Sequence, residues 1–160
     1  MSDELVLTPA ERAFAQALAD AGVRYLLVGM GAALLEGAQG ITQDLDFWVG
    51  EMDPEKLSAA AKRAGGYYTS GFGLQAPAVG GEGLERVDLV MAASGLDSFE
   101  QEYARSREYV IDGLPMRVLP LERVIANKRA AGRPKDIAHL PLLEAALAAR
   151  SLPKPEPRDE

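Results

Sequence analysis

Two aspartates one residue apart, Asp44 and Asp46, interrupt a short apolar stretch of the chain, QDLDFWV. If this stretch forms a β-strand, side chains two residues apart point to the same face, so the two carboxylates lie side by side. Adjacent carboxylates repel each other, and burying either one alone is costly in free energy. A divalent cation relieves both costs, and carboxylates without histidine or cysteine favour Mg²⁺ or Mn²⁺.

A third carboxylate, Asp88, occurs in a comparable context within the apolar stretch RVDLV. If its strand pairs with the strand of Asp46, three carboxylates converge and can hold two metal ions about 3.5 to 4 Å apart, the arrangement used for in-line displacement at phosphorus. A solvated strand face with an edge charge would give the same short pattern without any metal. The residues alone leave both interpretations open.

The distribution of charge indicates a localised anion as a ligand. The net charge of the 160 residues is −7, which disfavours binding of nucleic acid through the overall field. Residues 123–135 nevertheless carry five basic side chains and no acid, which leaves −12 on the rest of the chain. This basic segment suits a triphosphate better than a long polyanion, with a solvated helix face as the alternative. Its basic residues are Arg123, Lys128, Arg129, Arg133 and Lys135.

The composition is that of one folded domain. Apolar residues make up 48% of the sequence, which is enough for a core over residues 1–151, whereas the proline-rich charged stretch 152–160 is predicted to be a disordered tail. The chain has no cysteine, which fits a reducing compartment. No signal sequence and no apolar run near the roughly 20 residues of a membrane span are found, so we expect a cytoplasmic protein without a membrane partner.

Apolar periodicity, caps and glycines predict elements in the order α-β-α-β-α-β-β-α-β-β-α-α. This order is typical of an α/β (α+β) domain with a mixed β-sheet flanked by helices. A Rossmann fold is excluded because Gly29-Met30-Gly31 lacks the full glycine spacing. The predicted helices cover residues 9–21, 32–36, 53–64, 98–106, 121–131 and 135–150. The predicted strands are 24–28, 44–49, a short strand with a loop within 67–79, 84–91, and a hairpin over 108–118 that turns at Asp112-Gly113.

Two segments carry a resemblance to a known family. Residues 25–49, YLLVGMGAALLEGAQGITQDLDFWV, resemble the signature of the nucleotidyltransferase superfamily with the DNA polymerase β-like fold. That signature is a strand, Gly-Gly or Gly-Ser, a short helix and then Asp-hydrophobic-Asp. Residues 119–145, LPLERVIANKRAAGRPKDIAHLPLLEA, resemble the matching segment of small bacterial members related to the AbiEii-type toxins. Together the resemblance covers roughly residues 25–145.

The resemblance implies roles for individual residues. Asp44 and Asp46 would ligate the metals, and Asp88 would bind the catalytic metal and activate the attacking hydroxyl. Lys128, rather than Arg129, would face these carboxylates and contact the donor phosphates. The nucleotide-binding set that it implies is Gly29, Met30, Gly31, Lys128, Arg133, Lys135 and Asp136.

Two positions depart from the family pattern. Met30 stands where the family has a second glycine or a serine, and Gly40 stands where relatives often carry an arginine. Both changes reduce phosphate contacts, which is compatible with weak activity, an unusual donor or lost catalysis. His139 and Trp48 are interpreted as structural side chains before any functional role is assigned to them.

The sequence as a whole predicts a metal-dependent nucleotidyltransferase that moves an NMP from an NTP, such as ATP, to a hydroxyl acceptor. The acceptor could be an RNA 3′ end, a protein side chain or a small molecule, and a toxin–antitoxin pair with a cognate protein partner is one setting for it. The first alternative is a catalytically degenerate fold that binds a nucleotide or a partner protein. The second is a metal-dependent phosphohydrolase that uses the same acids.

Overall fold

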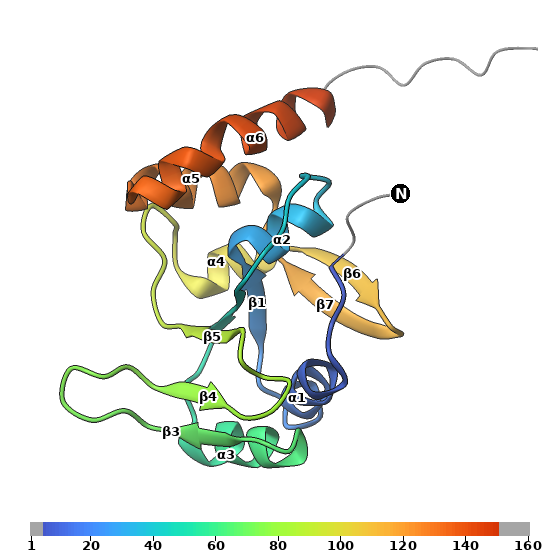
Figure 1. Cartoon of the computed structure of the whole chain (residues 1–160), viewed down its shortest axis with the longest axis vertical. Helices are drawn as coiled ribbons and strands as arrows, with labels where there is room; N and C mark the ends of the chain where they lie inside the picture. Colours follow the sequence, from blue (N-terminus) through green and yellow to red (C-terminus); the bar gives the residue numbers. More distant parts are fainter. Residues whose placement is uncertain (1–4, 151–160) are drawn as a thin grey trace, which may run out of the picture.

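The framework of the molecule is a five-stranded mixed β-sheet with the strand order β5-β2-β1-β7-β6 (Figure 1). The computed structural model describes residues 5–150, so the predicted tail over residues 152–160 lies outside the described residues. A separate two-stranded sheet pairs β3 with β4. The strands are β1 (Tyr25–Val28), β2 (Leu45–Val49), β3 (Tyr67–Thr69), β4 (Ala78–Gly80), β5 (Val87–Val90), β6 (Arg107–Ile111) and β7 (Leu114–Val118).

The helices form two groups around this sheet. Helix α1 packs against α3, while α5 packs against both α2 and α6. Figure 1 shows α5 and α6 together at one end of the molecule and α1 and α3 at the other, with the sheet between them. This arrangement confirms the predicted mixed sheet flanked by helices. The helices are α1 (Pro9–Asp20), α2 (Gly29–Leu35), α3 (Pro54–Arg63), α4 (Phe99–Arg105), α5 (Leu121–Ala131) and α6 (Pro134–Arg150).

Several element boundaries are confirmed where the sequence carries local signals. The hydroxyl of Thr8 accepts from the backbone N–H of Glu11 at 3.0 Å, and the Glu11 carboxylate accepts from the N–H of Thr8 at 2.8 Å, which completes a capping box for α1. Asp53 caps α3 in a similar way with its side chain. The β6–β7 hairpin turns at Asp112 and Gly113, whose φ angles of 50° and 77° match the primed turns that join tight hairpins.

Several predicted boundaries differ from the structure. The strand predicted over 84–91 covers only Val87–Val90. Helix α2 begins at Gly29 rather than at residue 32, because the chain turns directly from β1 into the helix at this glycine. Strand β2 begins after Asp44, so this residue precedes the strand. The stretch 67–79, predicted as one strand and a loop, instead contributes to two paired strands, which pack beside α3 and β5.

A buried carboxylate fixes the C-terminal helices over the sheet. Glu36, at the end of α2, is fully buried and accepts from the backbone N–H of Leu121 at 2.8 Å, at the start of α5. Arg107 of β6 contacts the same carboxylate at 2.6 Å, Arg150 at the end of α6 contacts it at 3.1 Å, and the hydroxyl of Tyr109 donates to it. Because four elements share this one charge, the position of α5 and α6 relative to α2 is well determined.

Within residues 5–150, no helix is both long enough and apolar enough to cross a membrane.

Candidate functional site

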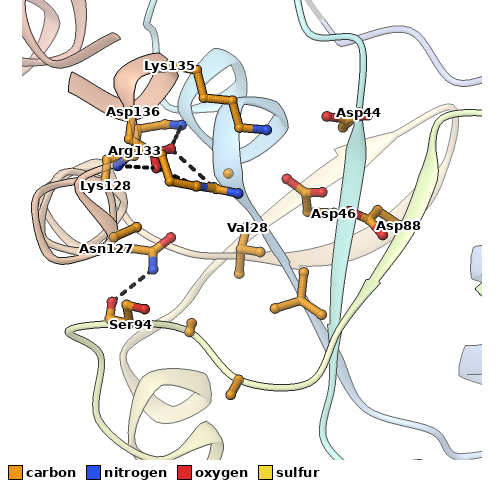
Figure 2. A pocket seen from close by; sticks show the side chains of 15 residues that line it. Val28, Asp44, Asp46, Asp88, Ser94, Asn127, Lys128, Arg133, Lys135 and Asp136 are labelled. Carbon is orange, nitrogen blue, oxygen red and sulfur yellow. Dashed lines mark hydrogen bonds and ion pairs between the residues drawn. The ribbon is translucent and has the colours of Figure 1, made fainter. Parts of the chain in front are cut away.

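A pocket of about 390 Å³ lies between the strands β1, β2 and β5 and the helix pair α5–α6. Figure 2 shows Asp44, Asp46 and Asp88 on the strand side of the pocket, and Lys128, Arg133 and Lys135 on the helix side together with Asp136. Charges of opposite sign therefore face each other across an open space. The charged residues of the pocket are Asp44, Asp46, Asp88, Lys128, Arg133, Lys135 and Asp136.

The strand register brings Asp46 and Asp88 together. Strand β2 pairs with β5 in parallel, and Asp46 lies directly opposite Asp88 in that pairing. Laterally paired residues point to the same face of a sheet, with the strands about 4.8 Å apart. On its other side Asp46 pairs with Val28, the last residue of β1. Leu45 and Phe47 alternate to the opposite face and are completely buried, so the pleat separates the carboxylates from the core.

The three aspartates on the strand side lack polar partners among the described residues. Within residues 5–150, the side chains of Asp44, Asp46 and Asp88 make no hydrogen bond and no ion pair. Burial, followed by the charges of Asp88 and Asp44, raises the pKa of Asp46 from 3.8 to about 6, although Lys128 acts in the other direction. A carboxyl group whose pKa is raised in this way toward neutral pH is typical of functional sites rather than of solvated strand faces.

The carboxylates are nevertheless not gathered into a closed metal site. Among the residues that the structure describes, no group of three or more His, Cys, Asp or Glu side chains is close enough together to hold a metal ion. Asp44 and Asp88 are exposed, whereas Asp46 is half-buried. The shared face and shared pocket therefore correspond to the prediction, but the tight convergence of the three acids is not present.

Gly29 lies against the central carboxylate. Its φ of 66° is in the left-handed region, and a Cβ built on it would lie 2.3 Å from Oδ2 of Asp46. Any side chain at this position would therefore collide with the carboxylate and strain the backbone as well. The absence of a side chain at Gly29 therefore makes space for the Asp46 carboxylate at the start of α2.

The helix wall of the pocket is organised by Asp136. This carboxylate is buried and contacts Nζ of Lys128 at 3.3 Å and Nε of Arg133 at 2.7 Å. Burial raises the pKa of Asp136, but the hydrogen bond from Arg133 and the charge of Lys128 outweigh it, so the pKa is lowered overall. The buried carboxylate of Asp136 therefore positions Lys128 and Arg133, and both of its oxygens are used in these contacts.

The basic segment divides into residues that line the pocket and residues that do not. Arg123 pairs with the buried Glu102 at 2.6 Å, and the exposed Arg129 pairs with Glu144. Lys135 lines the pocket and makes no hydrogen bond or ion pair within the described part of the chain, although its charge lowers the pKa of Asp46. Lys128, Arg133 and Lys135 thus line the pocket, whereas Arg129 does not.

Two residues of the predicted nucleotide-binding set do not line this pocket. Gly31 is buried, and a Cβ there would meet Leu45 and Leu27, so it serves helix–sheet packing. Met30 is buried and lines a second, adjoining pocket of about 420 Å³. The thioether of Met30 therefore does not crowd the pocket that contains all three carboxylates. Gly40 lies on the same side as Met30, where a Cβ would meet Leu142 of α6 at 3.5 Å.

Two polar residues of the pocket were not predicted from the sequence. Asn127 of α5 donates from Nδ2 to the carbonyl oxygen of Ser94 at 2.8 Å, and both line the pocket. Their only sequence signal is the position of Asn127 next to Lys128, because the loop of Ser94 is brought there by tertiary packing. Trp48 packs edge-on against Phe99 with ring centroids 5.5 Å apart and is buried, so it is a core residue.

Comparisons with known proteins bear on the fold. No protein-family model matches the chain, and no curated protein matches it significantly. The solution structure of the antibiotic-resistance factor ANT(2'')-Ia is 18% identical with a TM-score of 0.59, covering 88% of this chain and 84% of that chain. The crystal structure of ANT(2'')-Ia in complex with adenylyl-2''-tobramycin is 18% identical with a TM-score of 0.58, covering 87% of this chain and 88% of that chain. The chain therefore has the nucleotidyltransferase fold of the polymerase β-like type that its sequence predicted.

Proposed function

We propose that the protein is a metal-dependent nucleotidyltransferase that transfers an NMP from an NTP to a hydroxyl acceptor. The observation that carries this proposal is the pocket in which the paired residues Asp46 and Asp88 face Lys128, Arg133 and Lys135. Within residues 5–150 the three carboxylates make no ion pair, and they share the pocket with Lys128 and Arg133, which pair with Asp136, and with Lys135, which pairs with no acid. This arrangement suits a ligand that is both anionic and metal-bound, which describes a nucleotide triphosphate. The fold supports the same reaction class.

The donor set fits a hard divalent cation. Asp44, Asp46 and Asp88 are oxygen ligands without histidine or cysteine, which favours Mg²⁺ or Mn²⁺. Burial, followed by the charges of Asp88 and Asp44, raises the pKa of Asp46, and the charges of Lys128 and Lys135 only partly oppose this rise. Since Asp44 and Asp88 are exposed and unpartnered, their side chains are free to rotate toward a shared ion. When bound, such an ion neutralises charge on the phosphates and lowers the pKa of a bound hydroxyl.

The protein residues have separate tasks in this reaction. The acceptor oxygen forms a bond to the α-phosphorus, the bond from that phosphorus to pyrophosphate breaks, and the hydroxyl proton passes to Asp88. Lys128, Arg133 and Lys135 bind the phosphate oxygens that gain charge as pyrophosphate leaves. Asp136 holds Lys128 and Arg133 in position through its buried carboxylate.

Among the three acceptor classes, a small molecule has the best support. The similar crystal structure of ANT(2'')-Ia contains adenylyl-2''-tobramycin, a nucleotidylated small molecule. The pocket of about 390 Å³ is also of a size that binds small molecules. An RNA 3′ end, a protein side chain, the toxin–antitoxin setting and the cytoplasmic location stay predictions from the sequence.

A catalytically degenerate, nucleotide-binding module is the second candidate. It is favoured by the separation of the three carboxylates and by the absence of a cationic side chain at Gly40. Such a protein would bind NTP through Lys128 and its neighbours without releasing pyrophosphate.

The proposal is tested with an NTP labelled on its α-phosphate, incubated with Mg²⁺ and separate pools of small hydroxyl compounds, RNA and protein. Nucleotidyl transfer moves the label into one pool and releases pyrophosphate. Asp46→Asn should reduce the rate more than about 100-fold, since even residues that only support metal ligands cost 10- to 100-fold. Asp20→Asn, at an exposed ion pair of α1, is the matched control. Release of inorganic phosphate would indicate a hydrolase, and binding without turnover would indicate the degenerate module.

A further inference from the structure

The second pocket adjoins the first across a shared group of charges. Its volume is about 420 Å³, and five residues line both pockets. These shared residues are the ones assigned above to the metal and to the phosphates, so the reacting phosphates lie at the junction of two chambers. The shared residues are Asp44, Asp46, Lys128, Arg133 and Lys135.

The residues that are not shared distinguish the two chambers. Asp88 lines only the first pocket. Because Asp88 takes the proton of the acceptor in the proposed reaction, the acceptor must enter the first pocket. The part of the donor that extends beyond its phosphates then requires the second pocket.

The walls of the second pocket are suited to a flat, partly apolar ring. Met30 and Ile41 contribute apolar surface, and 88% of Ile41 is exposed in the free protein. An exposed isoleucine beside a pocket gains from a ligand that covers it. Gln43 adds a side-chain amide, which both donates and accepts hydrogen bonds. Phosphate oxygens gain nothing from the apolar part of this wall, whereas a nucleobase does.

His139 of α6 supplies a directed hydrogen bond in the same pocket. Its Nδ1 is buried and has no partner within residues 5–150, so the half-exposed ring presents its other atoms, including Nε2. Burial and the charge of Lys128 lower the pKa of His139, which favours the neutral ring. Because Nδ1 is buried without a partner among residues 5–150, Nε2 is the ring nitrogen that is open to a ligand, and a neutral ring with its proton on Nε2 donates from this atom.

We propose that the second pocket receives the base of the donor nucleotide, with Met30 and Ile41 against its ring and Nε2 of His139 donating to an acceptor atom at its edge. This inference rests on the proposed function, because it takes the position of the phosphates and the role of Asp88 from it. It adds the site of base recognition and a residue of α6 that selects for a nucleotide over a bare polyphosphate.

The test compares two probes, ATP and inorganic tripolyphosphate, by calorimetric titration in Mg²⁺. His139→Ala should weaken ATP binding roughly tenfold, through the lost hydrogen bond and ring contact, and leave tripolyphosphate binding unchanged. Ile41→Ser should act in the same direction, and its exposed position leaves the fold intact. Ile137→Ala is the matched control, since Ile137 is 56% exposed on the same helix and lines neither pocket.

Each outcome separates the inference from the function on which it rests. Equal losses for both probes in His139→Ala would overturn the inference, because the ring would then bind phosphate. Unchanged ATP binding in both His139→Ala and Ile41→Ser would overturn it as well. If the wild-type protein binds ATP no better than tripolyphosphate, no base site exists. Absence of binding of both probes to the wild type would overturn the proposed function and the inference together.

Discussion

Replacing Asp46 with asparagine should stabilise the protein at neutral pH, even though it removes a central residue of the site. Asp46 has a pKa of about 6 in the folded chain, against 3.8 ordinarily, chiefly because of burial and the charges of Asp88 and Asp44. Each pKa unit corresponds to about 1.4 kcal/mol, so the ionised carboxylate destabilises the fold by about 3 kcal/mol. Asparagine has nearly the same shape and carries no charge.

The sign of the pH dependence follows from linkage. A folded-state pKa above the unfolded one means that the folded protein binds the extra proton, so the wild type is relatively most stable below pH 3.8. Its stability then falls as the pH rises through 4 to 6, and the full cost is present above about pH 7. The advantage of Asp46→Asn should therefore be about 3 kcal/mol at pH 8 and less than about 1 kcal/mol at pH 4.

Urea denaturation of wild type and Asp46→Asn across this pH range measures the difference directly. In a thermal melt of a domain of this size, the same gain in stability at pH 8 would appear as a rise in Tm of roughly 6 to 12 °C. Asp20→Asn should show no comparable pH-dependent gain. A variant less stable than the wild type at pH 8, or a difference that does not change with pH, would refute the reasoning about burial and charge at Asp46.

Three further predictions concern neighbouring features. Mg²⁺ at about 100 times its dissociation constant should stabilise the wild type by about 2.7 kcal/mol and Asp46→Asn far less, measured by thermal melting; equal shifts would put the ion elsewhere. Lys128→Ala should weaken ATP binding about 10- to 100-fold, and Arg129→Ala, which removes a surface pair with Glu144, should change it little; equal titration results would exclude a directed role for Lys128. Gly29→Ala should reduce stability by about 1 to 3 kcal/mol in denaturant titrations, since its Cβ would lie 2.3 Å from Asp46; a neutral effect would show that the carboxylate moves freely.

The parts of the fold that local sequence determines were predictable. The capping box of Thr8 and Glu11 and the Asp112-Gly113 turn depend on residues within a few positions of each other, and the structure has the first helix and the hairpin turn close to where the sequence predicts them. The stretch 67–79 was harder, because glycines interrupt its apolar pattern. Its strands β3 and β4 pair across a loop, an arrangement that no local signal specifies.

The site could be predicted as a set of residues but not as a geometry. The types and spacing of Asp44, Asp46 and Asp88 suggested a shared face, yet the register that puts Asp46 opposite Asp88 depends on tertiary pairing. The same limit applies to the basic segment. Arg123 is as basic as Lys128, but only the fold shows that the buried Glu102 pairs with it at 2.6 Å.

Residues whose role depends on distant partners were also beyond the sequence. Met30 was expected to reduce phosphate contacts, but no sequence signal indicated that its side chain lines the second pocket. Asp136 belongs to the predicted nucleotide-binding set, but nothing in the sequence indicated that it is buried and pairs with Lys128 and Arg133. Burial and packing partners are set by the whole chain, and no short motif encodes them.

The most direct measurement is the rate of pyrophosphate release from NTP, as a function of Mg²⁺ concentration, for the wild type and Asp88→Asn. Asp88 is exposed and makes no hydrogen bond or ion pair within residues 5–150, so its replacement leaves the fold intact and isolates its chemical role. We expect Mg²⁺-dependent release by the wild type, in step with nucleotidyl transfer to an acceptor, and a loss of more than about 100-fold in Asp88→Asn. Release that is independent of Mg²⁺, or equal rates for the two proteins, would contradict nucleotidyl transfer at these carboxylates.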